Sequence, residues 1–235
     1  MMNQKYKFDA IFWDIDNTLL NLEYEERYAL KKCFRLFGLG KMTEEIFDDY
    51  RMINDKYWDL FAQGKLTKPF ILTQRFNELF KKYNLSVDSD KFNHTYLISL
   101  GDKVKYNDNS FKILKNLKGK IKQYALTDGT MIMKASQLKN AKLYKVLDNI
   151  FISETIGSCK PNKEFFDYVF DNIPKFQHSR ILIVGDGLKT DILGGKNAGI
   201  KTCYYNPNHK QVSEDIKIDY QIDNLKKIYD IIIEK

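Results

Sequence analysis

The chain has 235 residues, which is long enough for one full-sized domain together with an insert. Hydrophobic residues make up 43% of it and there are only four prolines, which excludes a largely disordered protein. The formal charge of +7 comes from lysines spread along the chain, without a basic block, so it does not indicate a nucleic-acid polymer as partner.

The cysteines and the apolar runs indicate in which cellular compartment the protein is expected. Cys33, Cys159 and Cys203 are far apart and share no metal-ligand spacing, which suits a reducing compartment. The apolar run near the N-terminus is interrupted by Asp9 and Asp14 and does not fit a signal peptide. No stretch reaches the roughly 18 apolar residues that span a bilayer. We therefore expect a cytoplasmic protein with no membrane partner.

Short apolar runs predict the strands of a parallel sheet. They lie at residues 10–13, 124–126, 149–152, 181–184 and 202–205. Runs without polar alternation suit strands that helices cover on both faces. Helix-like segments at residues 130–147, 162–172 and 190–198 lie between successive strands and are long enough for parallel crossovers. The pattern predicts an α/β fold with a doubly wound, mainly parallel, Rossmann-like sheet.

Residues 20–105 differ, because they lack strand-like runs and show helical periodicity instead. Apolar residues recur every three or four positions, at Ile46, Tyr50, Ile53, Tyr57 and Phe61, and again at Leu72, Phe76, Leu79 and Tyr83. Gly64 and Pro69 separate these two helices. We therefore predict an α/β core domain of residues 1–19 and 106–235, interrupted by an α-helical cap domain of residues 20–105. The expected hinges are residues 17–21 and 100–107.

Polar residues at the carboxyl ends of the predicted strands form the candidate site, because ligands bind at that edge of an open parallel sheet. The residues that this rule selects are Asp14, Asp16, Thr18, Thr127, Lys160, Asp186 and Asp191. Each has a simpler explanation when taken alone. The aspartates suit turns or helix starts, Lys160 suits a solvated surface, and Thr127 suits a helix cap. Their joint appearance at successive strand ends favours one shared site.

The pair Asp14 and Asp16 suggests a division of labour. Two residues apart in an extended chain, they project to the same side while Ile15 points away. One carboxylate can attack a phosphorus atom, and the other can protonate the leaving oxygen and later activate water. We assign Asp14 as nucleophile and Asp16 as acid/base, with Lys160 as the positive charge of the catalytic group.

So many carboxylates beside a phosphate dianion require a cation. Two like charges 4 Å apart repel by about 4 kcal/mol at an effective dielectric of 20. Mg²⁺ prefers hard oxygen ligands and is typically held by one or two carboxylates plus phosphate. Asp14 and Asp186 are the expected side-chain ligands, with Asp16 in the same metal site and Asp191 just outside the direct ligands.

The segment after the second strand predicts the phosphate-binding groups. Thr127 offers a hydroxyl, and Asp128 and Gly129 lead into a helix N-terminus whose amides face an anion favourably. The Lys160 ammonium adds a charged donor. We therefore expect Thr127, Asp128, Gly129 and Lys160 to surround the phosphate oxygens.

These segments resemble a known family. WDIDNTL, ALTDG, SCKPN and VGDGLKTD resemble the four motifs of the haloacid-dehalogenase superfamily of aspartate-nucleophile phosphatases, and the helical insert resembles its C1-type cap. The longer stretches ISETIGSCKPNKEFFDYVF, ILIVGDGLKTDILGGKNAG and CYYNPNHK, with the insert segment DYRMINDKYWDLFAQGKLT, are most similar to the non-canonical pyrimidine nucleotidases, which are 5'-nucleotidases. The resemblance implies magnesium-dependent hydrolysis of pyrimidine nucleoside monophosphates through an aspartyl-phosphate.

This chain departs from the resemblance at one site residue, and the residues that would choose the substrate are less certain from the motifs alone. Asp128 stands where many relatives carry asparagine, which adds a negative charge close to the phosphate. Asn54, Trp58 and Arg75 lie in the segments that resemble the family's cap, where an aromatic ring and donors can stack on and read a pyrimidine. Alternatively, Trp58 packs in a core and Arg75 pairs with a carboxylate on its own helix.

Other functions stay open at this point. Another branch of the superfamily, such as a phosphoglycolate or sugar-phosphate phosphatase or a phosphomutase, would carry the same four segments. A dehalogenase would leave Asp16 and Asp186 unexplained. A catalytically silent phosphate-binding regulator would normally have lost reacting groups, and a phosphoryl-accepting receiver domain would lack an insert of this size. Whether the protein is a monomer or a dimer is left undecided.

Overall fold

The structure is a computed structural model that describes residues 5–213 and 216–234. The chain divides into two units. The first contains the described parts of residues 1–22, 104–131 and 141–235, and the second contains Glu23–Lys103 and Ile132–Asn140. The second unit thus takes in a short stretch that we had expected in the core domain. Among the described residues, no helix is both long and apolar enough to cross a membrane.

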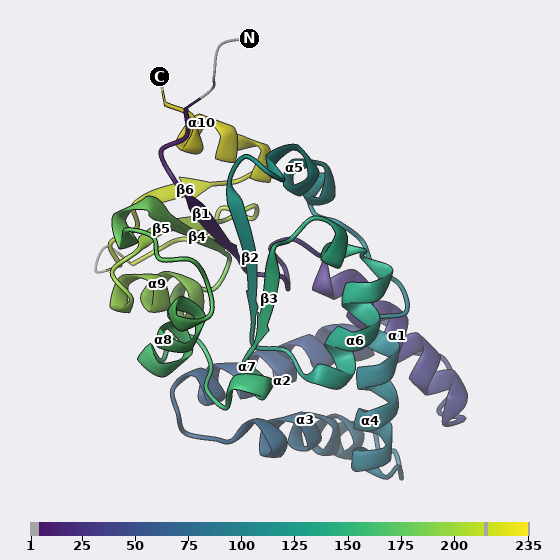
Figure 1. Cartoon of the computed structure of the whole chain (residues 1–235). Coiled ribbons are helices and arrows are strands. Elements are labelled where there is room, and N and C mark those ends of the chain that lie inside the picture. The colour runs from purple at the N-terminus through teal and green to yellow at the C-terminus, as the bar shows by residue number, and fades with distance from the viewer. Residues whose placement is uncertain (1–4, 214–215, 235) are drawn as a thin grey trace. The chain divides into compact units, whose positions relative to one another are not determined.

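The first unit is built on one parallel sheet (Figure 1). Within the described residues its strands are β1 Ala10–Trp13, β2 Lys122–Thr127, β3 Asn149–Ile152, β4 Ile181–Gly185, β5 Lys201–Tyr205 and β6 Tyr220–Ile222. They lie in the order β3-β2-β1-β4-β5-β6, and every neighbouring pair is parallel. In the register, Trp13 lies opposite Ala125 on one side and Val184 on the other. The doubly wound α/β fold is thereby confirmed, with its switch point between β1 and β4.

Helices cover both faces of this sheet. Helix α8 (Lys163–Asp171) packs against one face. Its Phe165 and Phe166 belong to the same buried cluster as Phe12 and Ile183 of the sheet. The other face meets helix α5 (Ser110–Leu117), whose Leu114 carbonyl accepts from the buried Gln123 side chain of β2. The shorter helical elements of the unit are α7 Ser153–Ile156, α9 Leu193–Asn197, α10 Ile228–Ile232, the 3-10 turns Leu143–Lys145, His178–Arg180 and Leu225–Lys227, and the π turn Leu188–Ile192.

Some elements differ from the sequence prediction. The helix expected at residues 130–147 is instead α6 (Met131–Asn140) followed by a separate 3-10 turn, because Lys142 adopts a left-handed conformation with φ of 51° between them. Strand β6 was not predicted. It has three residues and buries only Ile222 fully, so it carries no apolar run.

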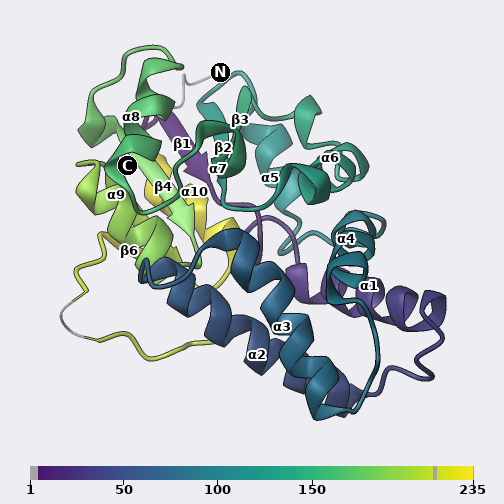
Figure 2. The ribbon, with the colours of Figure 1, turned by 90° about the horizontal axis from the view of Figure 1, so that it is seen from below.

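The second unit is helical. Its helices are α1 Leu22–Leu36, α2 Glu44–Ala62, α3 Lys68–Lys82, α4 Ser89–Leu100 and most of α6. The Thr43 hydroxyl caps α2 by accepting from the Ile46 amide at 3.2 Å, and the Asp88 carboxylate caps α4. Pro69 stands in the first turn of α3, where its missing N–H is not needed. Figure 2 shows α2 and α3 packed side by side.

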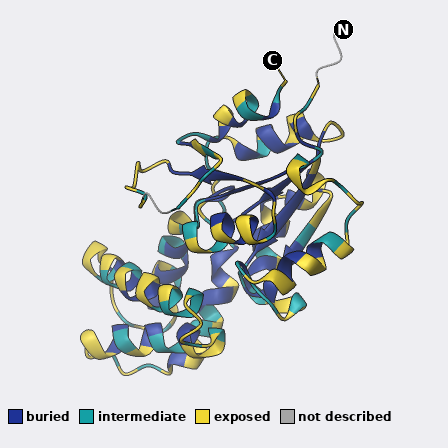
Figure 3. Ribbon diagram, turned by 90° about the vertical axis from the view of Figure 1, so that its left-hand side faces the viewer, coloured by how far each residue is buried: buried dark blue, intermediate teal, exposed yellow. Residues whose placement is uncertain are grey.

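Aromatic rings fill the interior of the second unit. Phe76 lies 4.9 Å from Phe92, 5.2 Å from Tyr96 and 5.6 Å from Tyr50, measured between ring centroids. These rings come from the faces of α2, α3 and α4 that are buried, while the opposite faces are exposed (Figure 3). The helical periodicity of the insert therefore did mark its buried face.

Candidate active site

The first two candidate carboxylates follow directly after β1, and a turn begins at Ile15 between them. The Asp14 amide donates to the Val184 carbonyl at 2.9 Å, which carries the β1–β4 ladder one step past the strand. Asp14 is buried and Asp16 is half-buried, and Ile15 between them is fully buried. Both carboxylates thus lie just past the carboxyl end of β1, and they are near enough for the charge of Asp16 to act on Asp14.

Thr127, the last residue of β2, joins this group. Its hydroxyl donates to Asp16 Oδ2 at 3.4 Å and accepts from the Gly129 amide at 3.2 Å. The neighbouring Asp128 carboxylate accepts from the Lys160 amide at 3.2 Å. The Asp128 side chain therefore fastens the loop that carries Lys160.

Lys160 lies at the centre of the site. Its buried ammonium donates to Asp14 Oδ1 at 2.8 Å, to Asp191 Oδ1 at 2.7 Å and to the Leu126 carbonyl at 3.0 Å. Each of its three protons thus has an acceptor. Burial alone would lower the pKa of Lys160, but the carboxylates around it outweigh burial and raise that pKa well above its ordinary value. The lysine is therefore a fixed positive charge beside Asp14.

Asp186 and Asp191 arrive from the segment after β4. The Thr18 hydroxyl donates to Asp186 Oδ1 at 3.2 Å and accepts from the Asp186 amide at 3.1 Å. Asp191 accepts from the Gly187 amide at 3.0 Å. At Gly185 a β-carbon would overlap the Asp191 carboxylate, so only glycine lets this loop fold so closely.

Three carboxylates gather beside Lys160. One oxygen each from Asp14, Asp186 and Asp191 lies within 4.8 Å of the others, and we name these three residues the carboxylate cluster. Asp191, which we had expected just outside the direct ligands, belongs to this group. The sequence-predicted residues of the α/β unit are thus brought together at one edge of the sheet.

The cluster holds more negative charge than Lys160 balances. Burial, above all, raises the pKa of Asp14 to about 7; Asp191 and Asp16 add to that rise, and Lys160 opposes it. Burial and neighbouring carboxylates likewise raise the pKa of Asp186 well above its usual range. Burial is the largest cause of both rises, and the neighbouring carboxylates add to it because one ammonium faces three acids. Hard oxygen donors in this arrangement fit a divalent cation such as Mg²⁺.

The residues expected to read the substrate lie in the helical unit. Arg75 is buried, and its guanidinium donates to Asn54 Oδ1 at 2.7 Å, Asn93 Oδ1 at 3.2 Å and the Tyr50 hydroxyl at 3.3 Å. We name these four residues the Arg75 network. Trp58 is half-buried and packs edge-on against Phe61. Asn54 and Arg75 thus bind each other inside the unit.

Sequence reasoning missed the groups that hold the site in place. The Leu126 carbonyl is one, because a backbone acceptor leaves no mark in the residue types. Asn107 and Ser110 are others, since both contact the loop after β1 from about 90 positions later in the chain. An asparagine in a linker reads as turn chemistry, so no signal pointed to it.

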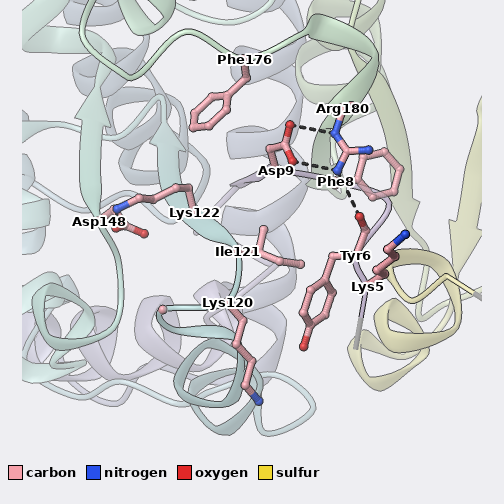
Figure 4. Close-up of a pocket in the computed structure, with 11 residues that line it drawn as sticks. Lys5, Tyr6, Phe8, Asp9, Lys120, Ile121, Lys122, Asp148, Phe176 and Arg180 are labelled. Atoms are coloured by element: carbon pink, nitrogen blue, oxygen red, sulfur yellow. Dashed lines mark hydrogen bonds and ion pairs between the residues drawn. The ribbon is translucent and has the colours of Figure 1, made fainter. Parts of the chain in front are cut away.

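A pocket of about 610 Å³ lies at the opposite, amino edge of the sheet (Figure 4). It is lined by Lys5, Tyr6, Phe8, Asp9, Gly119, Lys120, Ile121, Lys122, Asp148, Phe176 and Arg180. Two of its cations are paired there, Arg180 with Asp9 at 2.8 Å and Lys122 with Asp148 at 2.7 Å. None of the predicted catalytic residues lines it, so the candidate chemistry belongs to the carboxyl edge.

Comparison with known proteins agrees with this geometry. Residues 11–205 match the family model of haloacid dehalogenase-like hydrolases. The crystal structure of the HAD-hydrolase YfnB from Bacillus subtilis, described as bound to magnesium, superposes with a TM-score of 0.91 at 32% identity and covers 95% of this chain and 98% of YfnB.

Two curated relatives carry a more specific name. The pyrimidine 5'-nucleotidase YjjG of Escherichia coli is 29% identical, over 94% of this chain and 96% of YjjG. The pyrimidine 5'-nucleotidase PynA of Streptococcus pneumoniae is 27% identical, over 96% and 94%. Other matched relatives are named as phosphatases of different substrates.

Proposed function

Because this chain belongs to the haloacid dehalogenase-like hydrolase family, we propose that it hydrolyses phosphate monoesters, and specifically pyrimidine nucleoside 5'-monophosphates. The observation that supports hydrolysis most directly is the buried Asp14 carboxylate, paired with Lys160 at 2.8 Å and aimed at the same edge as Asp16. The nucleotide class is supported by the two pyrimidine 5'-nucleotidases among the relatives. A small phosphorylated metabolite is thus the expected partner.

The residues present suggest a two-step reaction. The Asp14 carboxylate attacks the phosphorus atom and forms an aspartyl-phosphate, while Asp16 gives a proton to the leaving oxygen. Asp16 then takes a proton from the water that hydrolyses this intermediate. The Thr127 hydroxyl and the Gly129 amide, which are hydrogen-bonded to each other, would turn to the phosphate oxygens when substrate binds. The Lys160 ammonium, whose three protons have acceptors in the protein, would act there as a positive charge.

The carboxylate cluster fits Mg²⁺, with Asp14 and Asp186 as ligands and Asp191 tied to Lys160. Asp16 lies outside this cluster, and we propose that it would add a further carboxylate to the same metal site. A bound Mg²⁺ would supply positive charge that offsets the repulsion between phosphate and carboxylates. The negative charge that Lys160 alone leaves unbalanced is the feature that such an ion would offset.

Another phosphatase of the same family is the main alternative. The groups at the carboxyl edge would serve any phosphomonoester equally well, so the substrate choice is a proposal carried by the relatives. A silent regulator is less well supported, since each reacting group has the partner that catalysis requires. Among the described residues no cysteine forms a disulfide bond, which is consistent with the cytoplasmic location that the sequence predicts.

A substrate panel tests this proposal. Phosphate release is measured with Mg²⁺ for pyrimidine and purine nucleoside monophosphates, phosphoglycolate and hexose phosphates. We expect kcat/KM for UMP, dUMP or dTMP to exceed that for the other classes by at least tenfold. A clear preference for phosphoglycolate or a hexose phosphate would replace the nucleotidase proposal by the alternative phosphatase. No hydrolysis of any ester would reject both.

A further inference from the structure

The loop that follows β1 carries two groups of the candidate site. Asp16 lies at its start, and Thr18 binds Asp186 through its hydroxyl at 3.2 Å. The Leu20 amide closes the loop on the Ile15 carbonyl at 2.9 Å, and Asn17 adopts a left-handed conformation with φ of 61°. The loop is short, yet it sets the direction of both functional side chains.

The four carbonyls of residues 17–20 all receive hydrogen bonds from one later segment. The Asn107 side-chain amide lies 2.9 Å from the Asn17 carbonyl and 3.2 Å from those of Thr18 and Leu20. The Asn107 backbone amide donates to Leu19 O at 3.0 Å, and the Ser110 hydroxyl donates to the same oxygen at 2.7 Å. The side-chain amide has two protons, so it serves two carbonyls fully and shares the third.

We propose that Asn107 is a positioning residue, which holds the loop of residues 16–20 so that Asp16 and Thr18 keep the geometry required for phosphoryl transfer. This inference rests on the proposed phosphatase function. No other side chain is recorded on the carbonyls of Asn17, Thr18 and Leu20 within the described part of the chain. Replacing the Asn107 amide frees these three oxygens and loosens the loop, while the backbone bond of residue 107 and the Ser110 bond still anchor it at the Leu19 carbonyl.

The role predicts a specific kinetic signature. The phosphate donors Thr127, Gly129 and Lys160 come from other segments, so phosphate binding should persist when the loop loosens. Protonation of the leaving oxygen by Asp16 should suffer, because a misplacement of about 1 Å can cost roughly 100-fold in rate. An acidic leaving group departs without that proton. The effect should therefore grow as the leaving group becomes less acidic.

The test compares p-nitrophenyl phosphate with phenyl phosphate, whose leaving phenol is less acidic. For Asn107→Asp, which keeps the shape but offers oxygens in place of the amide donors, we expect kcat/KM for phenyl phosphate to fall 10- to 100-fold. The fall for p-nitrophenyl phosphate should be at least fivefold smaller. Asn107→Ala, which adds no charge, should show the same selectivity. Circular dichroism and melting curves verify that both variants are folded.

Asn109→Asp is the matched control, because it makes the same chemical change two positions away in an exposed residue that makes no side-chain cap bond. It should leave both rates within twofold of the wild type. Equal losses for the two esters in the Asn107 variants, or no loss, would overturn the positioning role while hydrolysis by the wild type upholds the proposed function. A wild-type protein that cleaves neither of these esters nor any nucleoside monophosphate would overturn both.

Discussion

The carboxylate cluster and the Arg75 network are both buried, but their charges are balanced in different ways. In the cluster, the Lys160 ammonium bonds to Asp14 and Asp191, and Asp186 stands within reach of the same acids. In the network, the Arg75 guanidinium donates to neutral amide and hydroxyl oxygens and lies 4.9 Å from the Phe76 ring.

This difference indicates that the carboxylate cluster is a functional site and that the Arg75 network is part of the structural scaffold. The Arg75 network satisfies its donors with partners that folding itself supplies, so it needs nothing from outside. The cluster holds several buried carboxylates close together, and their pKa values are raised as a result. Perturbed pKa values of this kind are characteristic of functional sites. We expect the two groups to respond in opposite ways when a charge is removed.

Asp14→Asn should have the largest effect. Without a nucleophile, hydrolysis should fall by at least about 10⁴-fold. The free energy of unfolding of the metal-free protein should stay equal or rise, because the variant removes one of several crowded carboxylates. Phosphate release and urea unfolding measure the two quantities. Asp148→Asn, at a surface ion pair with Lys122, is the control and should change neither strongly. An active Asp14→Asn enzyme would refute the nucleophile assignment.

Removal of divalent cations should cause the second largest loss of hydrolysis. Chelation should reduce hydrolysis by at least about 1000-fold, and Mg²⁺ at 100 times its dissociation constant should stabilise the fold by about 2.7 kcal/mol. Thermal melting with and without Mg²⁺ measures this stabilisation of the fold directly and needs no substrate. Asp186→Asn should lose the melting response and Asp148→Asn should keep it. Undiminished hydrolysis after complete chelation would contradict a metal-dependent site.

The parts of the site that the sequence predicted share one physical origin. In a parallel sheet the carboxyl ends of the strands meet at one edge, so residues after separate apolar runs must converge. The runs at β1, β2 and β4 were recognisable because both sheet faces are covered and every position is apolar. Asp14, Thr127 and Asp186 followed from this rule alone.

The remaining features depend on contacts that residue types do not announce. Asn107 meets the loop after β1 from 87 to 90 positions away, and the Leu126 carbonyl is a backbone group. The burial of Arg75 was easier to infer from the sequence. It lies three residues after Leu72 and four before Leu79, both buried, so helical periodicity could have placed it on the inner face of α3. From the motifs, a role in substrate recognition and a pair with a carboxylate on the same helix instead both stayed open.

Arg75→Met should show the opposite response to Asp14→Asn. The variant leaves oxygens of Asn54 and Asn93 without their charged donor inside the helical unit, so we expect a loss of about 3 to 4 kcal/mol in the free energy of unfolding. Urea titration measures it, and Arg35→Met on an exposed position of α1 is the control. Under folding conditions KM for the best nucleotide should stay within twofold. A tenfold rise in KM would instead support substrate recognition by Arg75.

The smallest effect is expected at Glu26, the buried acid beside the Arg75 network. Burial, only partly offset by Arg51 and Arg75, raises its pKa from 4.5 to about 7. The folded state therefore holds a proton that the unfolded chain releases above pH 4.5, so stability declines as the pH rises from about 4.5 to 7 and levels off above that.

Across that range the loss is about 3 kcal/mol. Glu26→Gln cannot ionise, so it should remove this contribution from the profile and leave the decline that Asp14 and Asp186 cause. It should be more stable than the wild type by about 2 kcal/mol at pH 8, since it also gives up the 3.9 Å contact with Arg51. Urea unfolding at several pH values measures this difference, with Glu45→Gln at an exposed position as control. A variant that loses stability at pH 8 would show that the charged carboxylate of Glu26 is part of the scaffold, as the guanidinium of Arg75 is.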